Sequence, residues 1–302
     1  MSKIKDFWHR NRFYYDWKIF YRKGKPGLIL NNTAIEFKEF PVKKNCWGAD
    51  PLLFEYNGNL YLFFELFDKK KNKGVIAVSV FDGQKFGDYK IIIEEKGHLS
   101  FPFVFQFNNQ IYLMPETGYE KSIILFKAID FPYVWERDKL ILSGVNSSDS
   151  IFTLIDNKPV IIASILCGDA STCYNSYFEL DESLKIKELL YKSKKSNLGV
   201  RNAGPIFVDN NTFFRSGQYS PNNDYGKALA FFPFNPKNLK TEYNARKIVH
   251  VSDLKFSCEN KFDGIHTYSC SNNVEIIDVR TKKINSLLKM FFIIMKRIVF
   301  KK

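Results

Sequence analysis

Hydrophobic and polar positions alternate along most of this chain in short runs, and the runs come in pairs. Each pair is an apolar run, a polar turn of two or three residues, and a second apolar run, as in DPLLFEY-NG-NLYLFFE. Alternation with a period of two is typical of half-buried β-strands, and a polar turn between two such runs predicts a β-hairpin. Five hairpins are recognisable, with turns that begin at Asn57, Asn108, Asp156, Asp209 and Ser271.

The hairpins recur at intervals of about fifty residues between residues 45 and 282. A strand-built repeat of this period is typical of propeller blades. Third strands are expected after the hairpins, for example at GVIAVSVF and SIILFKAI. The chain is therefore predicted to be an all-β protein, a five-bladed β-propeller over residues 31–282. A strand at about 33–40 is expected to complete the last blade and so remove an exposed sheet edge.

Two segments differ from the repeats. Residues 1–30 form a basic, aromatic N-terminal segment. Residues 283–302 contain INSLLKMFFIIMKRIVFKK, in which apolar side chains gather on one side of a helix, opposite Lys289 and Lys296. Its apolar run is too short to span a bilayer, so we predict a short amphipathic, basic C-terminal helix. Two placements remain open, namely the plane of a membrane surface and the outer wall of the propeller.

The formal net charge is +13, and the excess charge lies at the two ends of the chain. Basic residues among aromatic and aliphatic ones favour attachment to an anionic membrane surface through residues 284–302. An acidic glycan or protein partner is the alternative. Nucleic acid is not expected, because the propeller itself is nearer to charge balance.

The first twenty residues lack the apolar run of a secretory signal, and the five cysteines lack the spacing of a disulfide scaffold. We therefore expect a cytoplasmic protein, peripheral at the inner face of the membrane. No Cys/His cluster has zinc spacing, and there is no phosphate-binding loop, dinucleotide fingerprint, nucleophile elbow or HExxH motif. Neither a metal nor a cofactor is expected.

A β-hairpin returns to the end of the sheet at which it started. The residues that enter its first strand and leave its second strand therefore lie together, and polar side chains occupy these positions in the repeats. If the innermost strands line the axis, these side chains meet in one pocket. Asp50 and Glu116 are the candidate catalytic residues, because a carboxylate in a partly dry cleft can act as an acid or a base. The candidate substrate-binding residues are Glu65, His98, Asp149, Arg201, Arg215, Gln218, Tyr225 and His266.

Each candidate also has a structural interpretation. Asp50 precedes a proline and could begin a strand, and Asp149 follows two serines and could belong to an ordinary turn. The two arginines could bridge neighbouring blades. In the functional interpretation, Glu65 and Asp149 hold hydroxyl groups, whereas the arginines and His266 hold an anionic group, for which the guanidinium fork is well suited. Recurrence at the same phase of successive repeats favours function.

The stretches ADPLLFEYNGNLYLFFE, HLSFPFVF, IYLMPET, FPYVW, VRNAGPIF and GIHTYS together resemble the N-terminal domain of glucosamine inositolphosphorylceramide transferases. The resemblance covers about residues 45 to 280, and the family also has bacterial members in surface-polysaccharide loci. In the plant transferases the glycosyltransferase domain is a separate C-terminal unit, so the resemblance does not by itself imply transferase activity.

A weaker similarity is to five-bladed propeller glycosidases of the arabinanase and β-xylosidase type. Asp50 matches the position of their catalytic base. The second blade offers Ser100 and Glu116 where they have an aspartate, and the third offers Asp149 where they have a glutamate. The glycosidase triad is therefore not reproduced in order, although chemistry with two carboxylates remains open.

Together these observations predict a carbohydrate-active protein of surface polysaccharide or glycolipid biosynthesis. It would bind a sugar or sugar nucleotide in the axial pocket and transfer a glycosyl group to a lipid-linked or polysaccharide acceptor. Two alternatives remain open: a non-catalytic glycan-binding module that recruits a partner enzyme, and a glycoside hydrolase.

Overall fold

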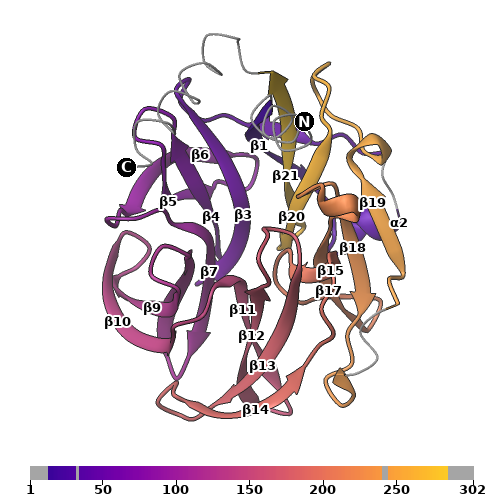
Figure 1. Ribbon diagram of the computed structural model, residues 1–302. Coiled ribbons are helices and arrows are strands. Elements are labelled where there is room, and N and C mark those ends of the chain that lie inside the picture. The colour runs from indigo at the N-terminus through magenta and orange to yellow at the C-terminus, as the bar shows by residue number, and fades with distance from the viewer. Residues whose placement is uncertain (1–12, 32–33, 240–243, 285–302) are drawn as a thin grey trace, which may run out of the picture.

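Five antiparallel sheets surround a common axis in the computed structural model (Figure 1). The structure describes residues 13–31, 34–239 and 244–284. The predicted all-β, five-bladed propeller is confirmed. The predicted C-terminal helix lies outside the described residues, apart from residues 283–284, which are the end of a strand.

The strands of each blade run in chain order from the axis outward in the first four blades. Blade one consists of β3 (Cys46–Tyr56), β4 (Asn59–Asp68), β5 (Lys73–Phe81) and β6 (Phe86–Ile93). Blade two consists of β7 (Ser100–Phe107), β8 (Gln110–Thr117), β9 (Ser122–Asp130) and β10 (Val134–Ser143). Blade three consists of β11 (Ser147–Ile155), β12 (Lys158–Leu166), β13 (Cys173–Leu180) and β14 (Ile186–Lys192).

In blade four the innermost position is shared by two short strands, β15 (Leu198–Asn202) and β16 (Phe207–Asp209), which both pair with β17 (Thr212–Tyr219). The blade continues outward with β18 (Ala228–Pro233) and β19 (Lys247–His250). Two single-turn 3₁₀ helices accompany it, η1 (Pro221–Asn223) and η3 (Val251–Asp253). Blade five consists, from the axis outward, of β20 (Gly264–Ser271), β21 (Val274–Ile284), β1 (Phe13–Lys23) and β2 (Lys38–Phe40).

Blade five is built from both ends of the described chain. β1 pairs with β21 along its whole length, from Phe13 opposite Ile284 to Lys23 opposite Val274. The short helix α2 (Leu28–Asn31) follows β1, and β2 then adds the outermost strand by pairing with β1. The strand expected at 33–40 is therefore only the edge of the blade. Residues 13–23, which we placed ahead of the propeller, are one of its central strands.

Burial on both faces explains why β1 belongs to the propeller. Ile19 and Tyr21 pack in the apolar cluster shared with blade one, whereas Phe20 packs in the cluster shared with blade four. The lysines and arginines of this segment mask that pattern in the sequence. No helix in the described part of the chain is long and apolar enough to cross a membrane.

At the far end of the blades, every inner hairpin turns through two successive residues with positive φ. The pairs are Asn57–Gly58, Asn108–Asn109, Asp156–Asn157, Asn210–Asn211 and Asn272–Asn273. Two such residues are the requirement of a type I′ turn, which asparagine and glycine meet at low steric cost. In the last two hairpins the pair begins one residue after the predicted start of the turn.

At the opposite end, the pairing between the first two long strands of every blade is interrupted. The register shifts fall between Ala49 and Leu52, Ser100 and Phe103, Ser148 and Ile151, Leu198 and Asn202, and Ile265 and Tyr268. Asp50, Phe101 and Asp149 have φ values of 49°, 44° and 44° there. A β-bulge redirects the side chains inside it. These irregularities place Asp50, Asp149, Arg201 and His266 at the same end of the propeller.

Candidate functional site

A cavity of about 310 Å³ opens where the bulged ends of the blades meet. It is lined by Trp17, Trp47, Ala49, Asp50, Glu65, Phe67, His98, Ser100, Glu116, Leu166, Ala170, Arg201, Tyr225 and His266. We call this cavity the axial pocket. Of the ten site residues expected from the sequence, seven line it: Asp50, Glu65, His98, Glu116, Arg201, Tyr225 and His266.

Arg215 does not line the axial pocket. Its side chain is fully buried, donates hydrogen bonds to the carbonyl oxygens of Gly199 at 2.9 Å and Val200 at 3.3 Å, and lies over the ring of Phe232. A buried guanidinium requires several acceptors, and here the backbone of blade four supplies them. The geometry does not support the predicted contact of Arg215 with an anionic ligand.

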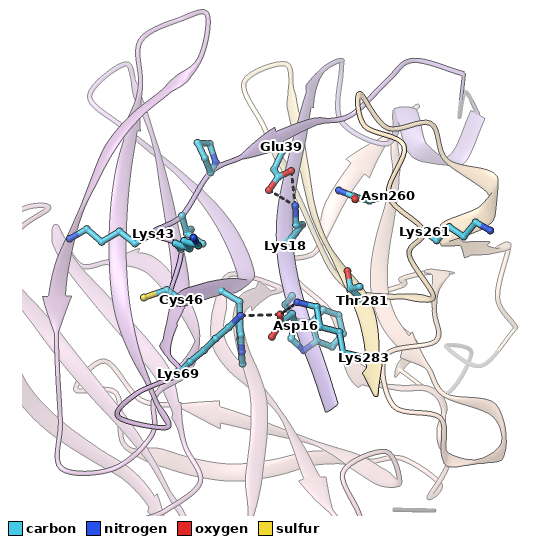
Figure 2. Close-up of a pocket in the computed structure, with 15 residues that line it drawn as sticks. Asp16, Lys18, Glu39, Lys43, Cys46, Lys69, Asn260, Lys261, Thr281 and Lys283 are labelled. Carbon is cyan, nitrogen blue, oxygen red and sulfur yellow. Dashed lines mark hydrogen bonds and ion pairs between the residues drawn. The ribbon is translucent and has the colours of Figure 1, made fainter. Parts of the chain in front are cut away.

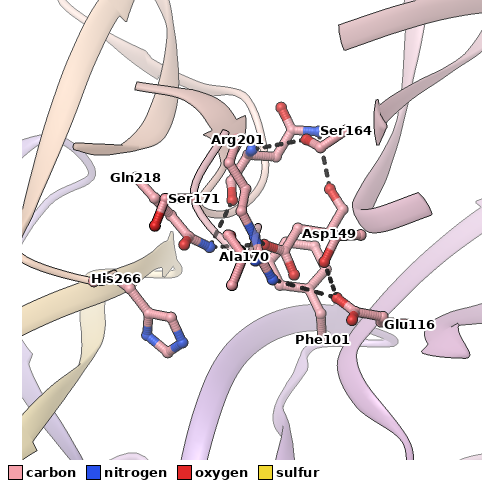
Figure 3. Close-up of polar contacts among 12 residues, drawn as sticks. Phe101, Glu116, Asp149, Ser164, Ala170, Ser171, Arg201, Gln218 and His266 are labelled. Carbon is pink, nitrogen blue, oxygen red and sulfur yellow. Dashed lines mark hydrogen bonds and ion pairs between the residues drawn. The ribbon is translucent and has the colours of Figure 1, made fainter. Parts of the chain in front are cut away.

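Asp149 and Gln218 lie beneath the pocket, where they hold Arg201 (Figure 3). Asp149 Oδ2 accepts hydrogen bonds from Nε of Arg201 and, at 2.7 Å, from Nε2 of Gln218. The guanidinium extends to Glu116, with Nη2 3.4 Å from Oε2. The hydroxyl of Ser148 donates to the same glutamate oxygen. The sequence predicted that Asp149 contacts a ligand. In the structure, Asp149 instead holds Arg201 in position.

A second polar network connects blades five, one and two around Asp50. Its Oδ1 accepts a hydrogen bond from the hydroxyl of Thr267 at 3.0 Å, and its Oδ2 accepts one from the backbone N–H of Phe101 at 3.1 Å. Its own N–H donates to Asp278 at 2.9 Å. His266 lies between the two aspartates, with Nδ1 2.7 Å from Asp278 and Nε2 3.4 Å from Asp50.

Asp278 is a site residue that the sequence analysis missed. It lies on β21 and is fully buried, and its Oδ1 accepts the backbone N–H groups of His266 and Thr267 as well as facing the imidazole. The available signal was one acidic residue inside the apolar strand VEIIDVR. A carboxylate in such a run must find donors inside the protein.

Burial dominates the ionisation of the two aspartates. It raises the pKa of Asp50 to about 6, although the charge of His266 opposes the shift. It raises the pKa of Asp149 to about 6 as well, against the opposing charge of Arg201. Burial alone lowers the pKa of His266, but the negative charges of Asp278 and Asp50 outweigh it, and the net shift is upward. Asp50 is therefore poised to exchange a proton near neutral pH.

Glu65 is held in a different state. Burial, with the added repulsion of Asp50 and Glu116, raises the pKa of Glu65 well above its ordinary value. Nδ1 of His98 accepts the N–H of Gly74 at 3.0 Å, so its other ring nitrogen, Nε2, faces Glu65 Oε1 at 3.2 Å. This contact lacks the geometry of a hydrogen bond, and Oε1 has no hydrogen-bond partner in the described structure. The raised pKa favours the protonated form of Glu65, which lines the axial pocket.

Aromatic rings form the walls of the axial pocket. Trp17 stacks on His266 with ring centroids 3.8 Å apart, and Trp47 stacks on Phe67 at 4.3 Å. The ring of Tyr225 lies under the guanidinium of Arg201, 4.9 Å away. The sequence analysis missed both tryptophans, Trp17 because we assigned its strand to a segment outside the propeller. Flat apolar walls with convergent carboxyl groups suit a ligand that carries both C–H faces and hydroxyl groups.

Asp50, His266 and Asp278 have ligand atoms within 4.8 Å of one another, so they are a possible metal cluster among the described residues. However, protein donors already occupy both oxygens of Asp50 and both of Asp278. A cation would have to replace those hydrogen bonds. The observed donors therefore fit a hydrogen-bonded network better than a cage of oxygen ligands, and the expected absence of a metal stays a prediction.

The sequence profile described as "Glucosamine inositolphosphorylceramide transferase 1, N-terminal" matches residues 32–280. Among curated relatives, glucosamine inositolphosphorylceramide transferase 1 of Arabidopsis thaliana is 29% identical over 228 residues, 73% of this chain and 29% of the plant protein. The protein of the same name from Oryza sativa subsp. indica is 30% identical over 217 residues, 65% of this chain and 27% of the rice protein. The chain thus spans less than a third of the length of these relatives.

Solved structures share the fold at low sequence identity. The GH43_1 enzyme from Xanthomonas citri, complexed with xylose, superposes with a TM-score of 0.56 at 12% identity, over 86% of this chain and 95% of that one. The catalytic domain of the GH62 α-L-arabinofuranosidase from Coprinopsis cinerea gives 0.55 at 11% identity, over 77% and 90% of the two chains. At such identities the likeness extends to the propeller fold alone.

Proposed function

Because this chain belongs to the family of the N-terminal domain of glucosamine inositolphosphorylceramide transferases, we propose that it is a carbohydrate-active protein of glycolipid or surface-polysaccharide biosynthesis. We propose further that the axial pocket binds the sugar and that the protein transfers a glycosyl group to a lipid-linked or polysaccharide acceptor. The observation that carries this proposal is the convergence in one pocket of a buried aspartate with a pKa of about 6 and a buried glutamate whose pKa is raised well above its ordinary value.

We propose a separate chemical role for each of the acidic residues that line the pocket. Asp50, ionised above pH 6, would accept the proton of the acceptor hydroxyl as its oxygen forms a bond to the anomeric carbon of the donor. The bond from that carbon to the leaving-group oxygen breaks, and the leaving group departs with the bonding electron pair. Glu65, whose raised pKa favours the protonated form, would donate a hydrogen bond to the sugar or to the departing oxygen. Glu116, the second catalytic candidate, is fixed by Ser148 and Arg201.

The aromatic walls of the axial pocket would contact the flat faces of the sugar ring. Trp17 and Trp47 would pack against its C–H faces, as aromatic side chains do with amphipathic ligands. The volume of about 310 Å³ is at the small end of the range for ligand pockets. It therefore suits the sugar part of a substrate, with the rest of the donor or acceptor outside the axial pocket.

A non-catalytic glycan-binding module is the second candidate. The observation that favours it is the extent of the match, since less than a third of each plant protein corresponds to this chain. Activity of those proteins can therefore depend on regions without a counterpart in the match. In this case Asp50 and Glu65 would only hold hydroxyl groups.

Turnover distinguishes these candidates. The purified protein would be incubated with a panel of sugar nucleotides and a lipid extract from its host, and the products identified by mass spectrometry. We expect a glycosylated product that disappears in Asp50→Asn and in Glu116→Gln but persists in Asp88→Asn, a matched change at an exposed aspartate of β6. Release of free sugar instead would indicate a hydrolase. Absence of turnover together with a ligand-dependent rise in Tm would indicate the binding module.

We propose further that the protein attaches to a membrane, which the basic and apolar composition of residues 284–302 supports. We also propose a cytoplasmic location, which the five free cysteines support. Deleting this segment should reduce co-sedimentation with vesicles that contain anionic lipid. Equal co-sedimentation of the truncated and complete chains would contradict the proposed attachment.

A further inference from the structure

A second pocket, of about 420 Å³, lies beside the axial pocket between blade five and the start of blade one (Figure 2). Trp17 and Trp47 line both cavities, so the two pockets meet at these indole rings. The second pocket takes its remaining lining from β1, β2, β21, the segment that leads into β3, the turn after β4 and the loop before β20. We call it the lysine pocket, because it is lined by Lys18, Lys43, Lys44, Lys69, Lys261 and Lys283.

Positive charge exceeds negative charge in the lysine pocket. Its six lysines face two carboxylates, Asp16 and Glu39. Lys18 pairs with Glu39 at 2.8 Å, whereas Lys69, at 2.9 Å, and Lys283 both pair with one oxygen of Asp16. Two ammonium groups on one carboxylate leave an excess of positive charge at Asp16. Dashed lines in Figure 2 mark hydrogen bonds and ion pairs among the pocket residues.

Three further lysines increase this excess. Lys43, Lys44 and Lys261 are exposed, and none of them forms an ion pair with another residue that the structure describes. Each carries a flexible four-carbon stem, which allows its ammonium group to reach a ligand in the pocket.

The axial pocket has the opposite electrostatic character. Asp50 and Glu116 line it, and Asp149 and Asp278 lie directly behind it, whereas the raised pKa of Glu65 reduces the negative charge of that carboxyl group. Its one arginine, Arg201, is already engaged by Asp149, Glu116 and the carbonyl oxygen of Ala170. A phosphate group would therefore be repelled from the axial pocket and attracted to the lysine pocket, although the two are contiguous.

We infer that the two pockets bind one phosphate-linked sugar, with the sugar ring in the axial pocket and the phosphate or diphosphate in the lysine pocket. This inference rests on the proposed function, because it takes the axial pocket to be the sugar site. The shared chemistry is a glycosyl or polyol phosphate, from either a soluble sugar nucleotide or a lipid headgroup. The position of the lysine pocket also suits a lipid, because Lys283 directly precedes residues 284–302, the segment proposed above to attach to a membrane.

The test removes three charges without leaving Asp16 unpaired. In the triple variant Lys43→Gln, Lys44→Gln and Lys69→Gln, the carboxylate of Asp16 keeps Lys283. The matched control is Lys194→Gln, Lys195→Gln and Lys237→Gln, three exposed lysines outside both pocket linings. Both triple variants have the same net charge, and equal Tm values would show that both fold.

Two kinds of probe separate the two sources. Calorimetry would measure binding of inorganic pyrophosphate, UDP-glucose and UDP-N-acetylglucosamine. Co-sedimentation would measure binding to vesicles of phosphatidylcholine with phosphatidylinositol and to vesicles of phosphatidylcholine alone. For the pocket variant we expect at least about tenfold weaker binding of the phosphate probes or of the phosphatidylinositol vesicles, since three of the six lysine charges are removed. The control should bind as the wild type does.

A loss confined to the soluble probes would identify a sugar nucleotide, and a loss confined to the vesicles would identify a lipid headgroup. Equal affinities of the pocket variant, the control and the wild type, or no phosphate binding by the wild type, would overturn the inference. Asp50→Asn separates this inference from the proposed function, because it should abolish turnover while pyrophosphate binding is retained. If pyrophosphate binding needs the lysines but no turnover is found, the lysine pocket stands and the transferase proposal fails.

Discussion

The indole of Trp17 stacks on the imidazole of His266 with an interplanar angle of 21°, although the two residues are at opposite ends of the sequence. Trp17 is on β1 and His266 on β20, and β21 lies between these strands in the same sheet. The pairing of β1 with β21 therefore closes the propeller and also completes a wall of the axial pocket. Fold closure and the candidate site depend on the same strand.

We expect Trp17→Ala to lower both stability and ligand affinity. Trp17 is 6% exposed, and truncating a buried tryptophan costs about 3–5 kcal/mol. Urea unfolding would measure the loss. Trp17→Phe keeps an aromatic face toward His266 and should retain most of the stability and the affinity. If Trp17→Ala has the same midpoint of urea unfolding as the wild type, the packing of Trp17 does not stabilise blade five.

The buried aspartates predict an unusual dependence of stability on pH. Because the pKa of Asp50 is about 6 in the folded protein and near 4 in the unfolded chain, the folded state retains a proton that the unfolded state releases. The stability this group contributes is fully present below pH 4 and is lost as pH rises through 6. The upward pKa shift of Asp149 acts in the same direction.

In the wild type, the shifted pKa of Asp50 lowers the free energy of unfolding by about 3 kcal/mol between pH 4 and pH 7. Asp50→Asn should abolish this decrease. Urea unfolding across that range would give the two pH profiles, with Asp88→Asn as the control that keeps the wild-type slope. Parallel profiles for Asp50→Asn and the wild type would show that burial does not shift the pKa of Asp50 as described.

A buried ion pair fixes the segment after β1. Nε of Arg22 donates to Glu275 at 2.8 Å, and the hydroxyl of Tyr268 and the N–H of Ile29 donate to the other oxygen of the same glutamate. We expect Glu275→Gln to lower the free energy of unfolding by about 3–5 kcal/mol, because it leaves the arginine buried without a counter-charge. Differential scanning calorimetry would compare it with Lys71→Gln, which breaks an exposed pair and should change the Tm far less. Similar effects of the two changes would contradict the buried pair.

Gly74 provides the space that Glu65 occupies. A Cβ atom at this position would lie 2.5 Å from Oε1 of Glu65 and 2.5 Å from the carbonyl oxygen of Leu99. Gly74→Ala should therefore destabilise the protein by about 1–3 kcal/mol and displace Glu65, with weaker ligand binding in calorimetry. Gly87→Ala is the matched control, since its nearest contact would be an ordinary 3.6 Å. Wild-type stability and affinity in Gly74→Ala would show that Glu65 is not confined as described.

Local patterns in the sequence predicted the hairpins and their turns. Runs of alternating apolar and polar residues on both sides of Asn57–Gly58 and of the four corresponding turns predict hairpins. The structure contains all five hairpins. The phase of these repeats also predicted that polar residues gather at one end, and seven of the ten candidates line one pocket. Such predictions succeed because a hairpin relates residues that are close in the chain.

The sequence by itself thus determined the repeat, the turns and the end of the propeller at which the site lies. Only the tertiary structure decided which strand closes blade five, which of the polar residues face the pocket and which face the interior. In the sequence, Arg215 and Asp149 have the same kinds of side chain, at the same end of the hairpins, as residues that line the pocket. In the structure, the bulges and the neighbouring blades bury both of them. Asp278 holds the backbone of Asp50, 228 residues away. Burial and pairing of this kind depend on which distant segments pack together, and no local pattern of hydrophobic and polar positions records that.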